Sequence, residues 1–488
     1  MHHFFQKLVR NSFFLGILFF TVQLLIILSI CPENSLSQAW LSLASHWDSV
    51  WYEAIAKVGY IGHEGPNHIG PYTSNVAFFP GYPYLARAII LIFGVQAKIA
   101  LLIVSQSAAL LFWCLLFHIL HNLAWREQIY AAILIMSFPT SWFLFMGYSE
   151  SLFILIGCLM LWLAIKKRWV LSGISGVFMT ATRLFGISIL IAPLLSNLII
   201  QLSHYNMRFQ LKRLCLNARK TVIKIQLSII RASEEVSWVF TPLFWVTIVG
   251  SLGTIGFLSY CYFAFGSWHL YFDIERVNWG ANATPLFLFK LPTWVPPPFG
   301  FAIDWVPPLP IHDSHVFLFK FFRLAAYNIS EILVPVFLWL FLIYSLFIIK
   351  SINSSTPSSQ AQQGISQDSA QCHHLKNPRC AWDDEEVVTI KKTKNLDLKS
   401  LTWFIAALLC FFVSCLSTYT RHYESMSRLL IPVWILLIIS DATHPDNLLF
   451  FRLKNYALGK IIIFIVIVIS SGFWLQLINR FFLNWWVA

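Results

Sequence analysis

The chain has 488 residues, of which 58% are hydrophobic and 11% are charged, and its mean hydropathy is +0.67. Soluble globular proteins average about 45–50% apolar and about 25% charged residues, so this composition argues against a water-soluble enzyme, a disordered scaffold and a small disulfide-stapled module. The formal net charge of +12 does not indicate a nucleic-acid partner, because the cations lie mostly in loops between apolar segments. The composition predicts an all-α, multi-pass membrane protein.

Apolar segments recur along the whole chain. A helix needs about 20 apolar residues to cross the hydrocarbon of a bilayer. Candidate spans occupy residues 11–30, 97–120, 128–146, 150–165, 185–202, 237–264, 331–349, 400–416, 428–440 and 459–479. Length leaves open whether the shorter runs 84–94 and 170–182 cross; we count the second as a span and the first as re-entrant or interfacial. The sequence therefore predicts a bundle of about 11 transmembrane helices.

The basic residues predict which loops face the cytoplasm. With the N-terminus inside, 23 of the 34 Lys and Arg residues lie in inside loops, as the positive-inside rule requires. These loops are 1–10, 121–127, 166–169, 203–236, 350–399 and 441–460. The outside segments, which hold nearly every unusual polar residue, are 31–96, 147–149, 183–184, 265–330, 417–427 and the C-terminal tail. The chain thus divides into a membrane region over 1–350, a low-complexity cytoplasmic linker over 351–399 and C-terminal transmembrane helices over 400–488.

The cysteines predict neither a metal centre nor a redox motif. None of the nine forms a CxxC pair, and five lie in apolar stretches. Cys372 and Cys380 flank His373 and His374, but this Ser- and Gln-rich segment carries no second ligand pair. We therefore expect no metal and no other cofactor.

The first outside loop carries an acidic residue between two tryptophans. Four apolar side chains recur there at the spacing of an amphipathic interfacial helix: Trp47, Trp51, Ile55 and Val58. Asp48, near the start of this helix, is either a charge partner of the helix N-terminus or a catalytic base at the bilayer edge. Glu53 and Lys57 are spaced as a surface ion pair. Further along, two prolines around Gly81 predict a fixed turn over 77–83.

Three more outside turns concentrate charged side chains. Glu150 stands at the start of a span, where it is either part of a helix cap or a second carboxylate of a site. Arg183, between two apolar runs, either snorkels to lipid phosphates or holds the phosphate of a bound lipid. The turn 419–428 indicates an anion site. The alternative is that Arg421 simply pairs with Glu424, three residues later. The charged or titratable residues of this turn are Arg421, His422, Glu424 and Arg428.

Taken in order, these motifs resemble the PIG-V-type mannosyltransferase family, which belongs to the GT-C class of integral-membrane glycosyltransferases. The resemblance covers most of the chain outside the linker. The residues that carry it are His46-Trp47-Asp48, Tyr52, Ile55-Ala56, Gly59-Tyr60, Phe78-Phe79-Pro80, Pro83, Tyr148-Ser149-Glu150-Ser151, Thr182-Arg183, Gly186 and Ser427-Arg428.

The resemblance implies a GT-C-like bundle and a polyprenyl- or dolichyl-phosphate sugar as donor, with mannose favoured. The acceptor would be lipid-linked or a glycan, and transfer would occur on the non-cytoplasmic face with inversion. Asp48 would be the catalytic base and Glu150 a second carboxylate of the catalytic site. The substrate-binding residues would be His46, Trp51, Tyr52, Tyr148, Arg183, Arg421, His422 and Arg428. A phosphate leaving group needs no metal, because there is no pyrophosphate to neutralise.

Two other classes of protein compete with this interpretation. A transporter or lipid flippase would also use charges in the membrane, but it predicts polar residues near span centres and Gly/Pro pairs inside spans. A non-catalytic scaffold predicts scattered outer charges. The clustering of polar residues at one interface favours surface chemistry. Since no endoplasmic-reticulum retention tail is visible, we expect a bacterial plasma membrane.

Overall fold

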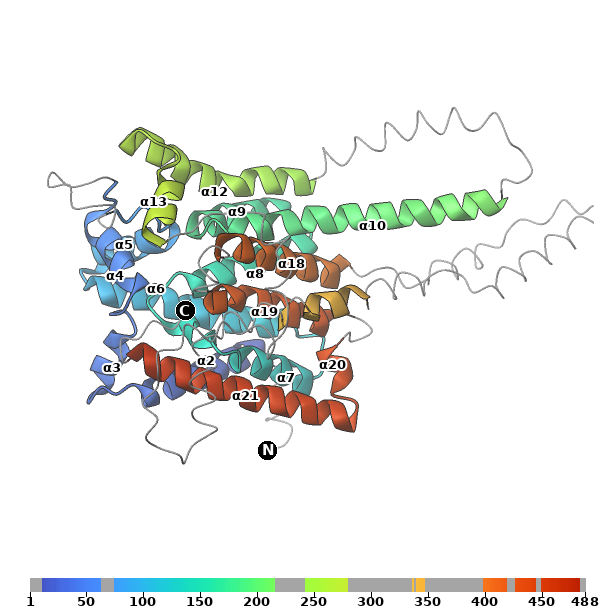
Figure 1. The fold of residues 1–488 in the computed structure, drawn as a ribbon, viewed down its shortest axis with the longest axis horizontal. Helices are drawn as coiled ribbons and strands as arrows, with labels where there is room; N and C mark the ends of the chain where they lie inside the picture. Colours follow the sequence, from blue (N-terminus) through green and yellow to red (C-terminus); the bar gives the residue numbers. More distant parts are fainter. Residues whose placement is uncertain are drawn as a thin grey trace, which may run out of the picture.

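The structure, a computed structural model, is built from helices that run side by side (Figure 1). It describes residues 11–62, 74–215, 242–279, 336–337, 339–346, 398–418, 426–444 and 449–482. Every regular element within these ranges is helical. In chain order they are α2 (Ser12–Ile30), α3 (Leu36–Ser42), α4 (Asp48–Val58), α5 (Gly81–Phe93), α6 (Ala97–Ile119), α7 (Trp125–Met136), the 3-10 helix η2 (Ser141–Phe145), α8 (Glu150–Ile165), α9 (Trp169–Thr182), α10 (Gly186–Cys215), α12 (Pro242–Phe265), α13 (Leu270–Trp279), α18 (Leu398–Thr418), α19 (Met426–Thr443), α20 (Phe450–Leu453) and α21 (Ala457–Phe482).

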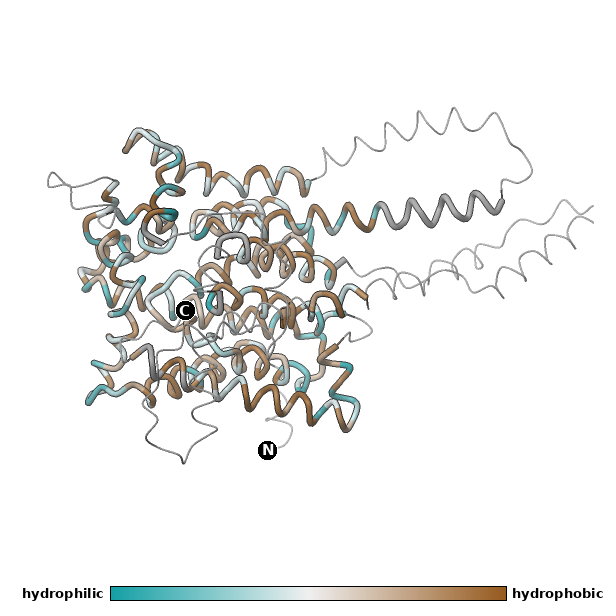
Figure 2. Tube along the Cα trace, viewed as in Figure 1, coloured by the Kyte–Doolittle hydropathy of each residue, from teal (hydrophilic) through white to brown (hydrophobic). Residues whose placement is uncertain are grey.

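The helices have the length and composition of a helical membrane protein. Four segments within the described ranges are long and apolar enough to cross a bilayer: α2, α6, α12 and residues 457–475 of α21. Five shorter apolar helical stretches accompany them. Figure 2 shows hydrophobic colour along the long helices and hydrophilic colour mainly near their ends. The all-helical class is therefore confirmed, whereas the count of about 11 spans stays a prediction.

The helices α8 and α9 form a hairpin that begins and ends at the same end of the bundle. α3, α4, α5 and α13 lie at the left-hand end in Figure 1, and α10 extends past the opposite end. α8 starts at the left-hand end and α9 returns to that end beside it. Two contacts show this: Ser172 of α9 donates to the carbonyl oxygen of Met160 in α8 at 3.0 Å, and Arg183 after α9 pairs with Glu150 at the start of α8. The segment 170–182 is thus one arm of a helical hairpin that returns to that end.

α5 does not cross to the opposite end. Its first residue, Gly81, lies against the end of α9, and Lys98 at the start of the next helix donates to Ser45 beside α4. At about 1.5 Å per residue, its 13 residues extend only about 20 Å, less than the hydrocarbon thickness. The short run 84–94 therefore belongs to a helix whose two ends both lie at this end of the bundle; whether it is re-entrant or interfacial stays a prediction. The turn predicted over 77–83 is too long, because Gly81 begins α5 and Pro83 is accommodated in the first turn of that helix.

One predicted span is not a single helix. The run 128–146 divides into α7, which ends at Met136, and η2, which begins at Ser141. Pro139 explains the break, because proline has no backbone N–H and disfavours helical geometry at the residue before it. The side chain of Ser141 then accepts from Gln23 of α2 at 3.2 Å and from Trp474 of α21 at 3.1 Å, which fixes the break inside the bundle.

At the opposite end, α10 continues the predicted span 185–202 as one helix to Cys215. The first part of the predicted inside loop 203–236 is therefore helical. Residues 216–241 and most of the linker 351–399 lie outside the described residues.

Candidate functional site

Four charged side chains from distant parts of the chain meet at the left-hand end of the bundle. Arg428 Nη1 lies 2.6 Å from Asp48 Oδ2, and its Nε lies 3.1 Å from Glu150 Oε1. Arg183 Nη1 lies 2.8 Å from the same Glu150 oxygen. Asp48 is the first residue of α4 and Glu150 the first residue of α8. Arg183 directly follows α9, and Arg428 lies in the first turn of α19. The structure thus brings together the predicted pair of carboxylates and two of the predicted cations.

The cluster is buried and its formal charges cancel. The side chain of Glu150 is 2% exposed and that of Arg428 is 9% exposed. The Arg428 guanidinium also lies 5.5 Å from the ring centre of Tyr148, as a cation–π contact. Burial lowers the pKa of Arg183, but the Glu150 carboxylate beside it more than offsets this and raises the pKa above its usual value. Both arginines are cations held by carboxylates in a largely buried site.

A strained turn sets the position of Asp48. Trp47 has φ 50° and ψ −119°, and the backbone N–H of Ser49 donates to the His46 carbonyl oxygen at 3.2 Å. This is the geometry of a type II′ turn, whose first central position usually holds glycine. The same His46 oxygen accepts from the Ser49 hydroxyl at 2.6 Å and from the Tyr148 hydroxyl at 3.1 Å. Three donors on one carbonyl therefore hold the turn that presents Asp48.

The structure shows the local contacts of Asp48 and of the start of α8, and the catalytic roles of Asp48 and Glu150 stay predictions. Asp48 does lie in the first turn of α4, as a helix charge partner would, but its carboxylate pairs with Arg428. Ser149 gives α8 no side-chain cap; its Oγ lies 2.9 Å from the hydroxyl of Tyr52. Burial raises the pKa of Tyr52 and of Tyr148, so both hydroxyls stay protonated near neutral pH.

Two glycines allow the backbone to close around the cluster. The N–H of Gly147 donates to the Leu43 carbonyl at 2.9 Å, and a Cβ at this position would lie 2.7 Å from the Cβ of Ala44. A Cβ at Gly81 would lie 2.6 Å from the Thr182 hydroxyl oxygen, one residue before Arg183. Any larger residue at either position would push apart the segments that carry the charges.

The other predicted substrate-binding residues lie around this centre or outside the described residues. The ring of His46 meets the edge of Phe482 with a centroid distance of 6.4 Å. The half-buried Trp51 stacks on Phe78 at 6.1 Å with 17° between the rings. The predicted Glu53–Lys57 surface pair is present at 2.6 Å. The predicted Arg421 and His422, and the cysteine–histidine segment 372–380, fall outside the described residues.

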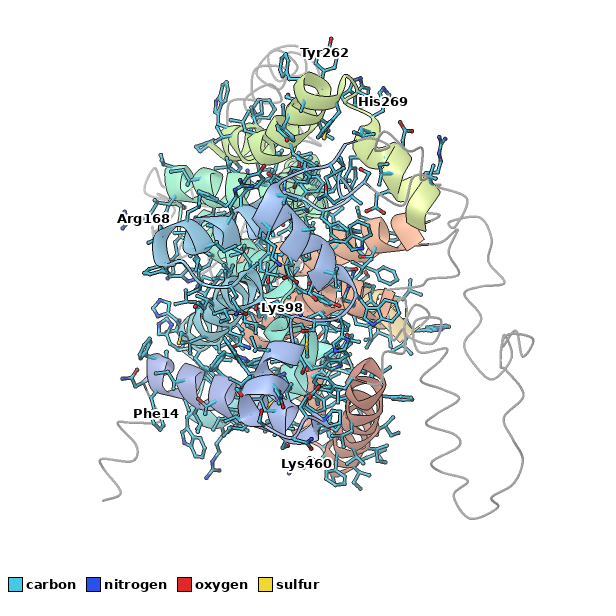
Figure 3. All side chains as sticks on the ribbon, turned by 90° about the vertical axis from the view of Figure 1, so that its left-hand side faces the viewer. Phe14, Lys98, Arg168, Tyr262, His269 and Lys460 are labelled. Carbon is cyan, nitrogen blue, oxygen red and sulfur yellow. The ribbon has the colours of Figure 1, made fainter. Side chains whose placement is uncertain are left out.

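Two neighbours of the site were not predicted. Tyr271 of α13 is buried, meets Phe79 edge to face at 5.1 Å and interacts electrostatically with Arg183. Lys98 donates to Ser45 Oγ at 3.0 Å. In Figure 3, which views this end of the bundle, Lys98 lies near the middle and His269 marks the α12–α13 side. The residues next to Tyr271 and Lys98 in the sequence form no motif, so their place beside the site could be found only from the three-dimensional packing.

A small apolar pocket adjoins the cluster. It is formed by α8, α10 and α19, the first and last of which also supply Glu150 and Arg428. Two of its residues, Ile154 and Pro432, follow those charged residues by one helical turn. The lining residues are Ile154, Gly157, Cys158, Ile189, Pro432, Ile435 and Leu436.

Comparisons of the chain with known protein families, with curated proteins and with solved structures find no match. Within the ranges that the structure describes, no group of three or more His, Cys, Asp or Glu side chains is arranged to hold a metal ion. Chemically, the cluster offers a carboxylate able to accept a proton next to two guanidinium groups shaped to bind a phosphate.

Proposed function

We propose that the protein is a membrane glycosyltransferase. It moves a sugar, mannose by the resemblance of its motifs, from a polyprenyl- or dolichyl-phosphate to a lipid-linked or glycan acceptor on the non-cytoplasmic face. The observation that carries the proposal is the buried cluster of Asp48, Glu150, Arg183 and Arg428. Their order along the chain is that of the motifs that resemble the PIG-V-type family and the GT-C class.

The cluster supplies what a direct displacement requires. The acceptor hydroxyl oxygen attacks the anomeric carbon, and its proton passes to Asp48. The bond from the anomeric carbon to the phosphate oxygen breaks, its electron pair stays on the phosphate, and Arg183 and Arg428 stabilise the charge that develops there. A single displacement inverts the anomeric centre. No sequence feature indicates a metal or another cofactor for this step.

The surroundings support a lipid-borne substrate. The pocket itself is too small to hold a lipid chain, but its apolar side chains from α8, α10 and α19 begin one helical turn from Glu150 and Arg428, so an apolar chain beside the phosphate would meet apolar surroundings. The half-buried Trp51 stacks on the buried Phe78 on the α4 side. A wall of this kind excludes water, which would otherwise hydrolyse the donor.

A transporter or lipid flippase is the competing function, and the position of the charges argues against it. The described charged cluster lies at one end of the helices rather than at span centres. A buried acid outside the cluster, Asp441, lies towards the other end of α19 and accepts from the backbone N–H groups of Leu449 and Phe451, which is a structural role. We place the protein in a plasma membrane of bacterial type as part of the same proposal.

The decisive experiment is a transfer assay. Membranes that contain the protein, and matched membranes that lack it, are incubated with radiolabelled polyprenyl-phosphate mannose, and labelled products are separated and identified. We expect a new labelled glycolipid or glycan that depends on the protein. Movement of intact donor across the bilayer without a new product would instead indicate a flippase.

A further inference from the structure

One carboxylate oxygen holds both arginines of the site. Glu150 Oε1 lies 2.8 Å from Arg183 Nη1 and 3.1 Å from Arg428 Nε. Glu150 is the first residue of α8, and its side chain is almost fully buried. Its neighbour Ser149 is held by Tyr52, so the start of α8 is itself fixed against α4. Glu150 therefore joins two guanidinium groups that are far apart in the sequence, one at the end of α9 and one in α19.

Asp48 occupies a different position. Its side chain is 12% exposed, against 2% for Glu150, and it meets Arg428 through Nη1 rather than through Nε. Nη1 donates a hydrogen bond to Asp48 at 2.6 Å, whereas the Nε–Glu150 contact at 3.1 Å is an ion pair without hydrogen-bond geometry, so the two carboxylates hold different parts of the guanidinium in different ways. An incoming phosphate can take the place of Asp48 on Nη1 while the Nε contact to Glu150 persists.

The geometry points to Glu150 as a positioning residue rather than a proton-transfer group. It fixes Arg183 and Arg428 as one phosphate-binding pair, and the Asp48–Arg428 contact is the one that the donor phosphate replaces. Binding of the donor then frees the Asp48 carboxylate for the acceptor hydroxyl. This assignment rests on the proposed function, and it changes the predicted role of Glu150 from second catalytic carboxylate to holder of the two cations.

A double-mutant cycle tests whether Glu150 acts through Arg183. Glu150→Gln, Arg183→Gln and the double variant are assayed for kcat and for KM of the donor and of the acceptor. We expect each single change to lower kcat/KM for the donor about 100-fold and the double variant to stay within about threefold of the worse single variant. Independent roles would multiply to about 10⁴-fold, and that result would overturn the proposal.

A charge-conserving cycle guards against misfolding. Removing one partner of a buried pair leaves an unpaired charge, so a single variant can be lost from the membrane. Glu150→Asp and Arg183→Lys keep both charges and change only the reach of the side chains. We expect the same coupling, a raised KM for the donor and an unchanged KM for the acceptor. The surface pair serves as the matched control: Glu53→Gln and Lys57→Gln should each stay within about twofold of the wild type.

The pH profile separates positioning from catalysis. If Asp48 is the base, the profile of kcat keeps its shape in Glu150→Gln; loss of its acidic limb in that variant would assign the proton transfer to Glu150 and overturn the inference. Should the wild type transfer no sugar, the proposed function fails on its own. The cycle is then repeated on the affinity for farnesyl phosphate, where coupled effects support the positioning role and additive effects overturn it.

Discussion

The carboxylate of Asp48 and the guanidinium of Arg428 lie 2.6 Å apart although 380 positions separate them along the chain. The first belongs to a helix at the start of the protein and the second to a helix that follows the low-complexity linker. The site therefore exists only after the last helices have packed against the first ones. This contact joins the two parts of the chain that the sequence divides, and it is the starting point for the predictions that follow.

Replacing Asp48 with Asn should nearly abolish sugar transfer. Asn has the shape of Asp but cannot accept the hydroxyl proton, and loss of a well-placed base costs about 10²–10⁴-fold in rate. Transfer from radiolabelled polyprenyl-phosphate mannose measures the effect, and the amount of protein in the membrane shows that folding is kept. Asp273→Asn, at an exposed position of α13 paired with Arg276, is the control. Near-normal transfer by the Asp48 variant would remove it from the role of base.

Replacing Arg428 with Lys should destabilise the protein and impair transfer. Arg428 reaches Asp48 and Glu150 through two different nitrogen atoms, whereas a lysine has only one. Arg428→Met should be worse, because it leaves two buried carboxylates facing one cation; breaking such a pair costs about 3–5 kcal/mol. In thermal unfolding in detergent, we expect the highest unfolding temperature for the wild type, a lower one for Arg428→Lys and the lowest for Arg428→Met. Equal unfolding temperatures for all three would show that the ion pairs do not hold the fold together.

Adding one methyl group at Gly147 should separate Asp48 from the arginines. The new Cβ would lie 2.7 Å from the Cβ of Ala44, a distance that real Cβ atoms do not adopt, so the segment before Asp48 must move. We expect Gly147→Ala to lose transfer and Ala44→Gly in the same chain to restore part of it. Gly256→Ala is the control, since nothing lies within 4 Å of its Cβ position. Full activity of Gly147→Ala alone would show that this close approach is not needed.

The turn at Trp47 predicts an unusual order of substitutions. At φ 50° a glycine is unstrained and a β-branched residue is strongly disfavoured. Trp47→Gly should therefore unfold at a higher temperature than Trp47→Val, with a difference of about 1–3 kcal/mol in the free energy of unfolding. Comparing two variants that both lack the indole removes the contribution of the tryptophan contacts. The reverse order would mean that the turn changes its geometry when the indole is absent.

The sidedness of the bundle is testable by labelling. Single cysteines are placed at Lys57 and Trp268, at the end of the bundle that holds the charged cluster, and at Arg168 and Lys460, in predicted inside loops, in a chain without its own cysteines. A membrane-impermeant maleimide added to intact cells should label the first two only. Labelling of the second two instead would put the charged cluster on the cytoplasmic side.

The sequence predicted the membrane class, most segment positions and the clustering of charges at one end. It succeeded there because apolar length and basic loops are local properties, and because Asp48, Glu150, Arg183 and Arg428 are charged residues at span ends, where a charge is costly without a partner. The sequence analysis also counted 170–182 as a crossing segment and 84–94 as re-entrant or interfacial; the structure arranges α9 as one arm of a helical hairpin and keeps α5 at one end, and membrane crossing itself stays a prediction.

What the sequence did not reveal depends on packing between distant segments. Hydropathy alone made 128–146 one span, although Pro139 interrupts the helix and Ser141 compensates with contacts to α2 and α21. The pairing of both arginines on one Glu150 oxygen cannot be read from spacing, since the three residues lie on different helices. Tyr271 gave no signal because its neighbour Arg183 is far away in sequence.

The balance of charges in the cluster has a consequence for selectivity among lipids. Phospholipids far outnumber any sugar carrier in the same leaflet, and each brings a phosphate to the depth of these helix ends. Two uncompensated guanidinium groups would gather such headgroups indiscriminately. Because Asp48 and Glu150 already neutralise Arg183 and Arg428, a visiting phosphate must first outcompete an internal carboxylate. If the proposed function holds, an ordinary headgroup would gain little from that exchange, and only a ligand with additional contacts would occupy the site.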